Sequence, residues 1–218
     1  MKKALFVLFI FAIFSGCNTA KFSVQEKRVI KKNYKNSIMP LLSVFNSKDS
    51  VSLYKPSEKI VIDSTDKKLI KLIDLLYQTC NDPSNPGVGI AAPQVGINKR
   101  IIWVQRFDKE NEPFEVYFNT EILNFSSLKS EGWEGCLSVP GYRGLVKRSD
   151  SILLKYDTFE KNNNIDTLTG FTAIIFQHEI DHLEGVLYID RILNKSNLYT
   201  EEEYKKYINL FNKNSSDK

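Results

Sequence analysis

The sequence contains little histidine, cysteine and tryptophan: its 218 residues include 2 histidines, 3 cysteines and 2 tryptophans. Three cysteines are too few for a disulfide framework, so an apolar core must stabilise the fold. The chain also has no internal repeat, no low-complexity tract and no apolar run of the about 20 residues that a membrane-spanning helix needs. A hydrophobic content of 42% and a charged content of 26% are typical of a globular protein. These features indicate one domain.

The longest apolar run, residues 4–14, follows two lysines and precedes the small residues Ser15 and Gly16. Its length is typical of the hydrophobic region of a signal peptide. With Cys17 directly after it, the segment is similar to the lipobox of bacterial lipoproteins. We therefore predict a lipoprotein-type signal peptide over residues 1–17, lipidation at Cys17, and a membrane-anchored location in the cell envelope that faces the periplasm. Ordinary signal cleavage and an uncleaved anchor stay open, and the location is cytoplasmic if the leader is not used.

Basic residues concentrate near the start of the chain. Residues 21–35 carry a net charge of +5, and Lys2 and Lys3 raise it to +7, whereas the whole chain carries only +4. The remainder is therefore slightly acidic, which argues against a nucleic-acid-binding protein with a basic stripe on its folded surface. We predict a basic, flexible tether over residues 18–37, either as a solvated spacer or in contact with anionic lipid.

The pattern of apolar residues predicts an α+β catalytic domain over residues 38–198, and a polar helix and tail over residues 199–218. The helices expected are residues 66–80, capped at Ser64, Thr65 or Asp66, residues 171–184, which end at Gly185, and residues 200–212. Short runs rich in β-branched and aromatic residues predict strands over residues 101–107, 115–118 and 151–157.

Both histidines lie in the segment QHEIDH, residues 177–182. Residues four apart share one face of a helix, so His178 and His182 can bind one metal ion together. Glu179 is rotated by about 100° from His178 and can transfer a proton instead of binding the ion. Two structural histidines close together by accident are the alternative, but the spacing and the intervening glutamate favour a metal-binding HExxH helix.

A tetrahedral metal site with one open position needs a third protein ligand. No histidine follows His182, Glu184 points away from the metal-binding face, and residues 201–203 lie in a late polar segment. The better candidate is Cys136, which lies among the glycines of residues 131–144 and offers a soft, anionic thiolate.

Three segments together resemble the signature motifs of the peptide deformylases: GVGIAAPQ at residues 87–94, EGCLS at residues 134–138 and QHEIDHLEG at residues 177–185. They occur in the order of the family, and only Ile90 departs, where the family has leucine. The resemblance covers residues 60–195. It implies a peptide-deformylase-like fold with small antiparallel or mixed sheets around a central metal-binding HExxH helix. It also implies a hydrolase that removes the N-formyl group from the N-terminal formylmethionine of peptides or proteins.

The resemblance implies a ligand set and a proton carrier. Cys136, His178 and His182 are expected to bind one divalent ion, Fe²⁺ by preference, which Zn²⁺, Ni²⁺ or Co²⁺ can replace. Such an ion lowers the pKa of water towards about 7. Glu179 is expected to accept the proton of that water and later to pass it to the leaving amine.

The resemblance also implies the residues that bind substrate. Gln94 and the backbone N–H of Leu137 are expected to form the oxyanion hole, where one donor typically contributes about 3 kcal/mol. Gly89 is expected to hydrogen-bond the peptide backbone. Arg143 matches a basic residue near the substrate channel. The residues expected to line the methionine pocket are Val88, Phe171, Ile174 and Ile175.

Several residues admit two roles. Glu134 can hydrogen-bond near Cys136 or Arg143, or it can be an ordinary turn carboxylate. Asp181 can orient a metal-binding imidazole or form a salt bridge on the helix. The residues expected to serve packing are Cys80, Trp103 and Trp133.

The expected partner is a formylmethionyl peptide, and the expected state is a monomer that binds no nucleic acid. Two other functions stay open: an envelope metallopeptidase or amidase that accepts larger acyl groups, and a non-catalytic envelope lipoprotein with a deformylase fold. An exported enzyme would meet only formylated chains that escaped processing in the cytoplasm. An oxidising compartment also endangers a metal thiolate, which favours zinc over iron or an anaerobic organism.

Overall fold

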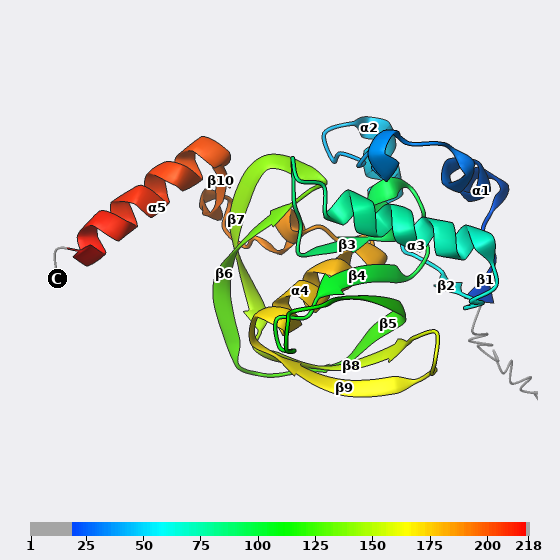
Figure 1. The fold of residues 1–218 in the computed structure, drawn as a ribbon. Helices are drawn as coiled ribbons and strands as arrows, with labels where there is room; N and C mark the ends of the chain where they lie inside the picture. The colour runs from blue at the N-terminus through cyan, green and yellow to red at the C-terminus, as the bar shows by residue number, and fades with distance from the viewer. Residues whose placement is uncertain (1–18, 217–218) are drawn as a thin grey trace, which may run out of the picture.

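A computed structural model describes residues 19–216, so the predicted leader and Cys17 lie outside the described residues. Helix α4 (Gly170–Leu183) lies at the centre, between a five-stranded and a three-stranded antiparallel sheet (Figure 1). The larger sheet has the order β3 (Gly89–Ala91), β4 (Ile101–Gln105), β5 (Phe114–Phe125), β8 (Ser151–Asp157) and β9 (Asn164–Thr169). The smaller sheet has the order β10 (Leu198–Thr200), β7 (Val139–Ser149) and β6 (Lys129–Cys136). This arrangement confirms the α+β class and the central helix.

Of the other helices, the first three cover the larger sheet and one end of the molecule, whereas the last projects away from the body at the opposite end (Figure 1). They are α1 (Val24–Lys31), α2 (Ser47–Leu53), α3 (Lys67–Cys80) and α5 (Glu201–Ser216), with 3-10 turns at Lys35–Ser37, Ala92–Val95, Tyr188–Arg191 and Lys195–Asn197. A short parallel pair, β1 (Thr19–Ala20) and β2 (Lys59–Ile60), completes the fold. Between residues 19 and 216, none of the helices has the length and apolar character needed to cross a membrane.

The predicted helices and strands occur close to their predicted bounds, except that the strand predicted over residues 115–118 is β5, which continues to Phe125. Asp66 caps α3 by accepting a hydrogen bond from the backbone N–H of Lys68. Gly185 follows α4 with a φ of 70°, a conformation that favours glycine at the end of a helix. Cys80 is fully buried in the core between α3 and the larger sheet, as expected. The indole of Trp103 donates to the carbonyl of Ile73, which confirms its packing role.

The segment predicted as a flexible tether is a folded part of the domain where the structure describes it. Ser23 and Glu26 form a capping box that starts α1. Phe22 and Ile30 lie one on each side of this box in the sequence, and both are buried in the cluster that contains α3. The density of lysines predicts a solvated spacer. The prediction is wrong because apolar residues recur among the lysines at helical spacing.

The glycine-rich segment around Cys136 is a long β-hairpin rather than a loop. Strands β6 and β7 pair from Lys129 opposite Ser149 to Cys136 opposite Val139, with an irregularity between Glu134 and Cys136. Trp133 on β6 packs against tyrosines of β10 and α5. The hairpin therefore carries Cys136 at its turn, where it faces α4.

Candidate metal centre and active site

Helix α4 and the β6–β7 turn bring three donor side chains together. His178 and His182 lie one turn apart on α4, with ring centroids separated by 5.2 Å. The Sγ of Cys136 lies 3.2 Å from the Nε2 of His182. One donor atom from each of the three residues lies within 4.8 Å of the others. An ion with bonds of about 2.0 to 2.3 Å holds nitrogen and sulfur donors at similar separations.

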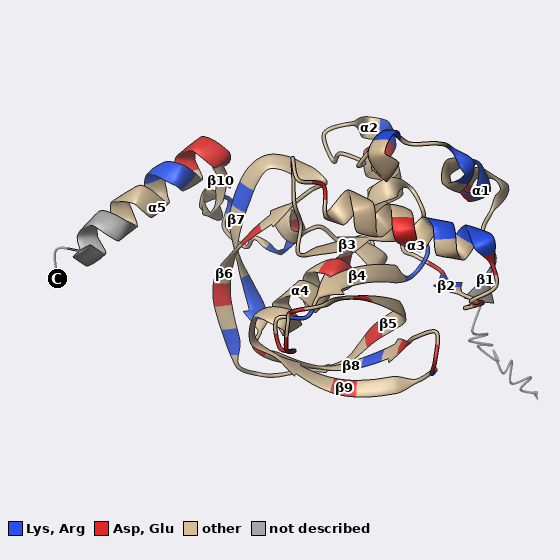
Figure 2. Cartoon of the chain, in the orientation of Figure 1, with Lys and Arg blue, Asp and Glu red and all other residues tan. Residues whose placement is uncertain are grey.

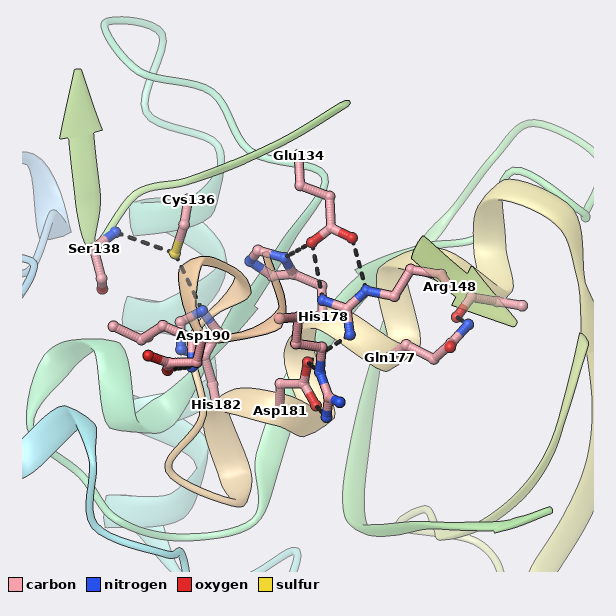
Figure 3. A network of polar contacts seen from close by, with 12 residues as sticks. Glu134, Cys136, Ser138, Arg148, Gln177, His178, Asp181, His182 and Asp190 are labelled. Atoms are coloured by element: carbon pink, nitrogen blue, oxygen red, sulfur yellow. Dashed lines mark hydrogen bonds and ion pairs between the residues drawn. The ribbon is translucent and has the colours of Figure 1, made fainter. Parts of the chain in front are cut away.

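Two N–H groups point to the sulfur of Cys136. The backbone N–H of Ser138 points to its sulfur at 3.4 Å, and the side-chain amide of Gln94 does so at 3.6 Å. Figure 3 shows the sulfur between Ser138 and His182. A cysteine binds a metal ion through its thiolate form. The two imidazoles and this thiolate make a mixed donor set suited to a divalent transition metal.

Glu134 fixes the orientation of His178. Its Oε2 accepts a hydrogen bond from the Nδ1 of His178 at 2.8 Å, which leaves Nε2 for an ion. The guanidinium of Arg148 binds both oxygens of the same carboxylate, at 2.7 and 2.9 Å. Burial acts to raise the pKa of Glu134, but the hydrogen bonds from Arg148 and His178 outweigh it and hold the pKa at about 2. Glu134 therefore acts on His178, rather than on Cys136 or Arg143.

Asp181 forms salt bridges, but to β7 and to the 3-10 turn Tyr188–Arg191 rather than along its own helix as predicted. Its carboxylate binds Arg148 at 2.5 Å and also pairs with Arg191. Arg148 therefore joins Asp181 of α4 to Glu134 of β6 (Figure 3). Gln177 adds a second link, because its side-chain amide exchanges two hydrogen bonds with the backbone of Ser149 on β7. Together these contacts fix the hairpin, and with it Cys136, against α4.

Glu179 is buried beside the donor set. Its side chain is 4% exposed, and its Oε2 has no hydrogen-bond partner among residues 19–216. Burial raises the pKa of Glu179 to about 7, while the neighbouring His178 acts to lower it. A general base or acid works best with a pKa near the operating pH. The position and chemistry of this carboxylate thus fit the role of proton carrier.

Gly89 on β3 makes room for that carboxylate. A Cβ built on Gly89 would lie 2.5 Å from the Oε1 of Glu179 and 3.0 Å from two of its carbons. Any larger residue would therefore displace Glu179. Since β3 is the terminal strand of the larger sheet, its outer edge is also able to pair with an extended peptide.

The amide of Gln94 is held with its N–H₂ group towards the sulfur. Its Oε1 accepts a hydrogen bond from the backbone N–H of Ala91 at 2.9 Å. The Nε2 atom is thereby directed to Cys136 and to the hydroxyl of Ser138, 3.4 Å away. This amide is a buried, uncharged donor, which suits an oxyanion hole.

One cavity of ≈ 570 Å³ joins nearly all of the predicted residues. The predicted residues that line it are Val88, Gly89, Gln94, Cys136, Leu137, Arg143, Phe171, Ile174, Ile175, His178 and Glu179. His182 is not among the lining residues; it lies behind them, 1% exposed. Arg143 is at the side of the cavity, where it contacts Glu201 of α5 at 3.3 Å.

Sequence reasoning missed two residues of the site. They are Arg148 and Gln177, which hold the hairpin against α4. Gln177 lies next to His178 inside the motif, which is the available signal. Arg148 carries no local signal, because its partners are distant in the sequence.

The helix-borne HExxH pair, the thiolate of the hairpin and the adjacent carboxylate define a mononuclear, metal-dependent hydrolase. The sequence profile of the polypeptide deformylase family matches residues 42–197. The chain belongs to this family.

Similar proteins include peptide deformylase 2 of Nostoc sp., which is 43% identical over 66% of this chain and 82% of its own length. A peptide deformylase of Prochlorococcus marinus is 36% identical over 93% of this chain and 96% of its own length. Among solved structures, a class I type b peptide deformylase of Acinetobacter baumannii with actinonin bound has a TM-score of 0.61 at 37% identity, over 71% of this chain and 98% of that one. A peptide deformylase of Synechococcus elongatus in complex with actinonin has a TM-score of 0.64 at 30% identity, over 81% and 89% of the two chains.

Proposed function

We propose that this protein hydrolyses the N-formyl group of N-terminal formylmethionine in peptides or proteins. The observation that carries the proposal is that Cys136 and His178, backed by His182, meet the carboxylate of Glu179 and the amide of Gln94 in one cavity beside an apolar pocket. The A. baumannii deformylase has also been solved with Met-Ala-Ser bound. Its likeness to this chain supports a peptide substrate here.

The substrate is placed by strand pairing and by apolar packing. Its backbone extends along the outer edge of β3, where Gly89 offers hydrogen-bonding groups without a side chain. Its methionine side chain enters the apolar part of the cavity formed by Val88, Phe171 and Ile174, with the buried Ile175 behind. Each buried methylene contributes about 0.8 kcal/mol to binding. The formyl group then lies beside the donor set.

The residues of the chain divide the chemistry between them. A divalent ion held by Cys136, His178 and His182 supplies Lewis-acid chemistry, which polarises a carbonyl and lowers the pKa of water. Glu179 accepts a proton from the attacking water and gives it to the amine nitrogen as the C–N bond breaks. Gln94 and the backbone N–H of Leu137 donate to the formyl oxygen as it becomes negative. The products are formate and a free amino terminus.

The test is release of formate by the purified chain loaded with iron, nickel or cobalt under anaerobic conditions. We expect formate from formyl-Met-Ala-Ser, no acetate from acetyl-Met-Ala-Ser, and no cleavage of the unblocked peptide. Glu179→Ala is the matched inactive control. Cleavage of the acetylated or unblocked peptide would instead favour an amidase or peptidase, and no turnover in a well-metallated sample would refute the proposal.

We propose Fe²⁺ as the ion, with Zn²⁺, Ni²⁺ and Co²⁺ as replacements. The thiolate and two imidazoles support a transition metal over a hard cation such as Mg²⁺. Metal analysis after anaerobic and aerobic purification from the native host tests this choice. Zinc in both preparations, with full activity, would reject iron.

We also propose that the protein is a monomer, lipidated at Cys17 and anchored at the periplasmic side of the cell envelope. The support is the sequence of residues 1–17 alone. Incorporation of labelled palmitate that is lost in Cys17→Ser tests the modification, and membrane fractionation tests the location. Sedimentation of the detergent-solubilised protein tests the monomer. Recovery of unlabelled protein from the cytoplasm would reject the anchor.

A further inference from the structure

Basic residues gather on α1, on the turn after it and on the start of α3, at the end of the molecule that carries β1 (Figure 2). We call these residues the basic region: Lys21, Lys27, Arg28, Lys31, Lys32, Lys35, Lys67, Lys68 and Lys71. Six of them are exposed; the others, Lys27, Lys68 and Lys71, are half-buried. The catalytic site uses none of them.

The basic region is a fixed surface and not a mobile chain. The ammonium group of Lys71 on α3 donates to the carbonyls of Lys31 and Lys32, at 3.4 and 3.1 Å. Lys31 is the last residue of α1 and Lys32 is its C-cap, so the ammonium group lies at the end of the helix where its dipole favours a cation. Ile30 of α1 and Leu72 of α3 are both fully buried in the same cluster. The two helices therefore hold their charges in one place.

Acidic side chains contribute little on α1, whereas the exposed Asp63 and Asp74 flank the basic residues of α3. The one acidic residue of residues 21–35, Glu26, is 8% exposed and faces the buried ammonium of Lys99 at 3.8 Å. Asp66 is half-buried at the cap of α3. Residues 21–35 carry +5, so the rest of the chain, Lys2 and Lys3 apart, carries −3 because the total is +4; the three lysines at the start of α3 are balanced by Asp63, Asp66 and Asp74. The charge of the molecule is thus polarised.

We propose that the basic region docks the folded domain on an anionic phospholipid bilayer. Opposite charge selects such a surface, and each basic residue near it strengthens binding by about fivefold. The position of the apolar run, residues 4–14, also argues for a bilayer as the partner. Residues 4–14 precede Thr19 closely in the sequence, and β1, which begins at Thr19, lies beside α1 and the start of α3 (Figure 1). The segment able to enter lipid is therefore joined to the charged end of the domain.

This orientation leaves the active site accessible. Strands β6, β7 and β10 and the start of α5 lie at the other end of the molecule from α1 (Figure 1). They contribute Trp133, Tyr142 and Glu201 to the wall of the cavity. A domain that docks through α1 and α3 thus presents this side of the cavity away from the bilayer.

A nucleic acid fits the basic region less well than lipid. Proteins that bind single strands combine positive charge with exposed aromatic side chains on which bases stack. The aromatic residues within or beside these two helices, Phe22, Tyr34 and Tyr77, are buried or half-buried. The hydroxyl of Tyr34 also donates to the carbonyl of Val29. Charge without an exposed stacking surface favours a lipid headgroup layer.

Lysine acetylation of the full chain, followed by mass spectrometry, tests the proposal without reference to catalysis. The chain is reconstituted with vesicles of phosphatidylcholine alone or with phosphatidylglycerol added. We expect Lys32 and Lys67 to react at least about tenfold more slowly on the anionic vesicles, and 1 M salt to remove this protection. Lys147, exposed on β7, should react equally in both. Equal reactivity of Lys32 and Lys67 on the two vesicles overturns the proposal.

A triple variant and a charge-matched control show which surface is responsible. Arg28→Glu, Lys31→Glu and Lys35→Glu together should abolish the protection of Lys32 and Lys67. Lys129→Glu, Lys195→Glu and Lys205→Glu change the net charge equally at exposed positions elsewhere and should leave the protection intact. Retained protection in the first variant contradicts the proposal. Equal or stronger protection by a single-stranded RNA oligonucleotide also contradicts it, and points to a nucleic-acid surface instead.

Discussion

Glu134 accepts a hydrogen bond from the Nδ1 of His178 at 2.8 Å, although 44 residues separate them in the chain. This contact fixes which nitrogen of the imidazole faces the metal site. Loss of such a partner typically lowers metal affinity by about 10- to 100-fold. We therefore predict that Glu134→Gln weakens metal binding in this range, measured by competition with a chelator. Glu131→Gln, an exposed change on the same strand, is the control and should have no effect.

Gly89→Ala tests the contact between β3 and Glu179. The added Cβ would lie 2.5 Å from the Oε1 of Glu179, so the carboxylate must move. A displacement of about 1 Å at a catalytic group can lower the rate by about 100-fold. We expect a loss of this size in kcat with formyl-Met-Ala-Ser. Gly132→Ala is the matched control, since a Cβ there meets no atom within 4 Å. An unchanged kcat in Gly89→Ala would refute the role given to this glycine.

Ile30→Ala tests whether α1 belongs to the folded domain. Ile30 is fully buried, and removal of a large buried side chain costs about 2 to 5 kcal/mol. We predict a decrease of this size in the free energy of unfolding by urea. Val24→Ala in the same helix, 67% exposed, should change it by less than about 0.5 kcal/mol. Equal, small effects of both substitutions would support the flexible tether.

The sequence does contain the signals that predict helix α1. The capping-box pattern of Ser23 and Glu26, with Phe22 and Ile30 around it, was readable as the start of an amphipathic helix. The density of lysines, which is typical of a solvated spacer, favours the opposite prediction. Local patterns of this kind did predict α3, α4 and β8 within a residue or two.

Local sequence patterns do not predict the hydrogen-bond network around the metal site. The motifs identify the donor set and Glu179, because these residues lie within short segments that resemble the motifs of the family. Arg148 was not identified, since its two carboxylate partners are 14 and 33 residues away and meet it only after β7 packs on α4. Glu134 was recognised as a residue of interest, but its partner was not, for the same reason.

The ion pair between Arg106 and Asp108 predicts a pH dependence of stability. Arg106 binds both oxygens of Asp108, at 2.8 and 2.7 Å, and these hydrogen bonds lower the pKa of Asp108 from 3.8 to about 2. A lowered carboxyl pKa stabilises the fold above the unfolded pKa, and this contribution disappears as the pH falls from about 4 to about 2. Asp108 is one third exposed, so we expect Asp108→Asn to cost only about 0.5 to 1 kcal/mol at pH 7.

Urea unfolding at pH 7 and at pH 2 to 3 measures this difference. The stability of the two proteins should converge at the lower pH. Glu110→Gln, an exposed change in the same loop, is the control. A difference that stays constant down to pH 2 would show that Asp108 acts through packing and not through its charge.

X-ray absorption of the zinc-loaded chain tests the central claim most directly. Cys136, His178 and His182 together predict one sulfur at about 2.3 Å and two nitrogens at about 2.0 to 2.1 Å from the metal. In Cys136→Ser the sulfur shell should vanish, while the nitrogens remain. A metal shell without sulfur in the unsubstituted protein would contradict the ligand set, and with it the proposed hydrolase.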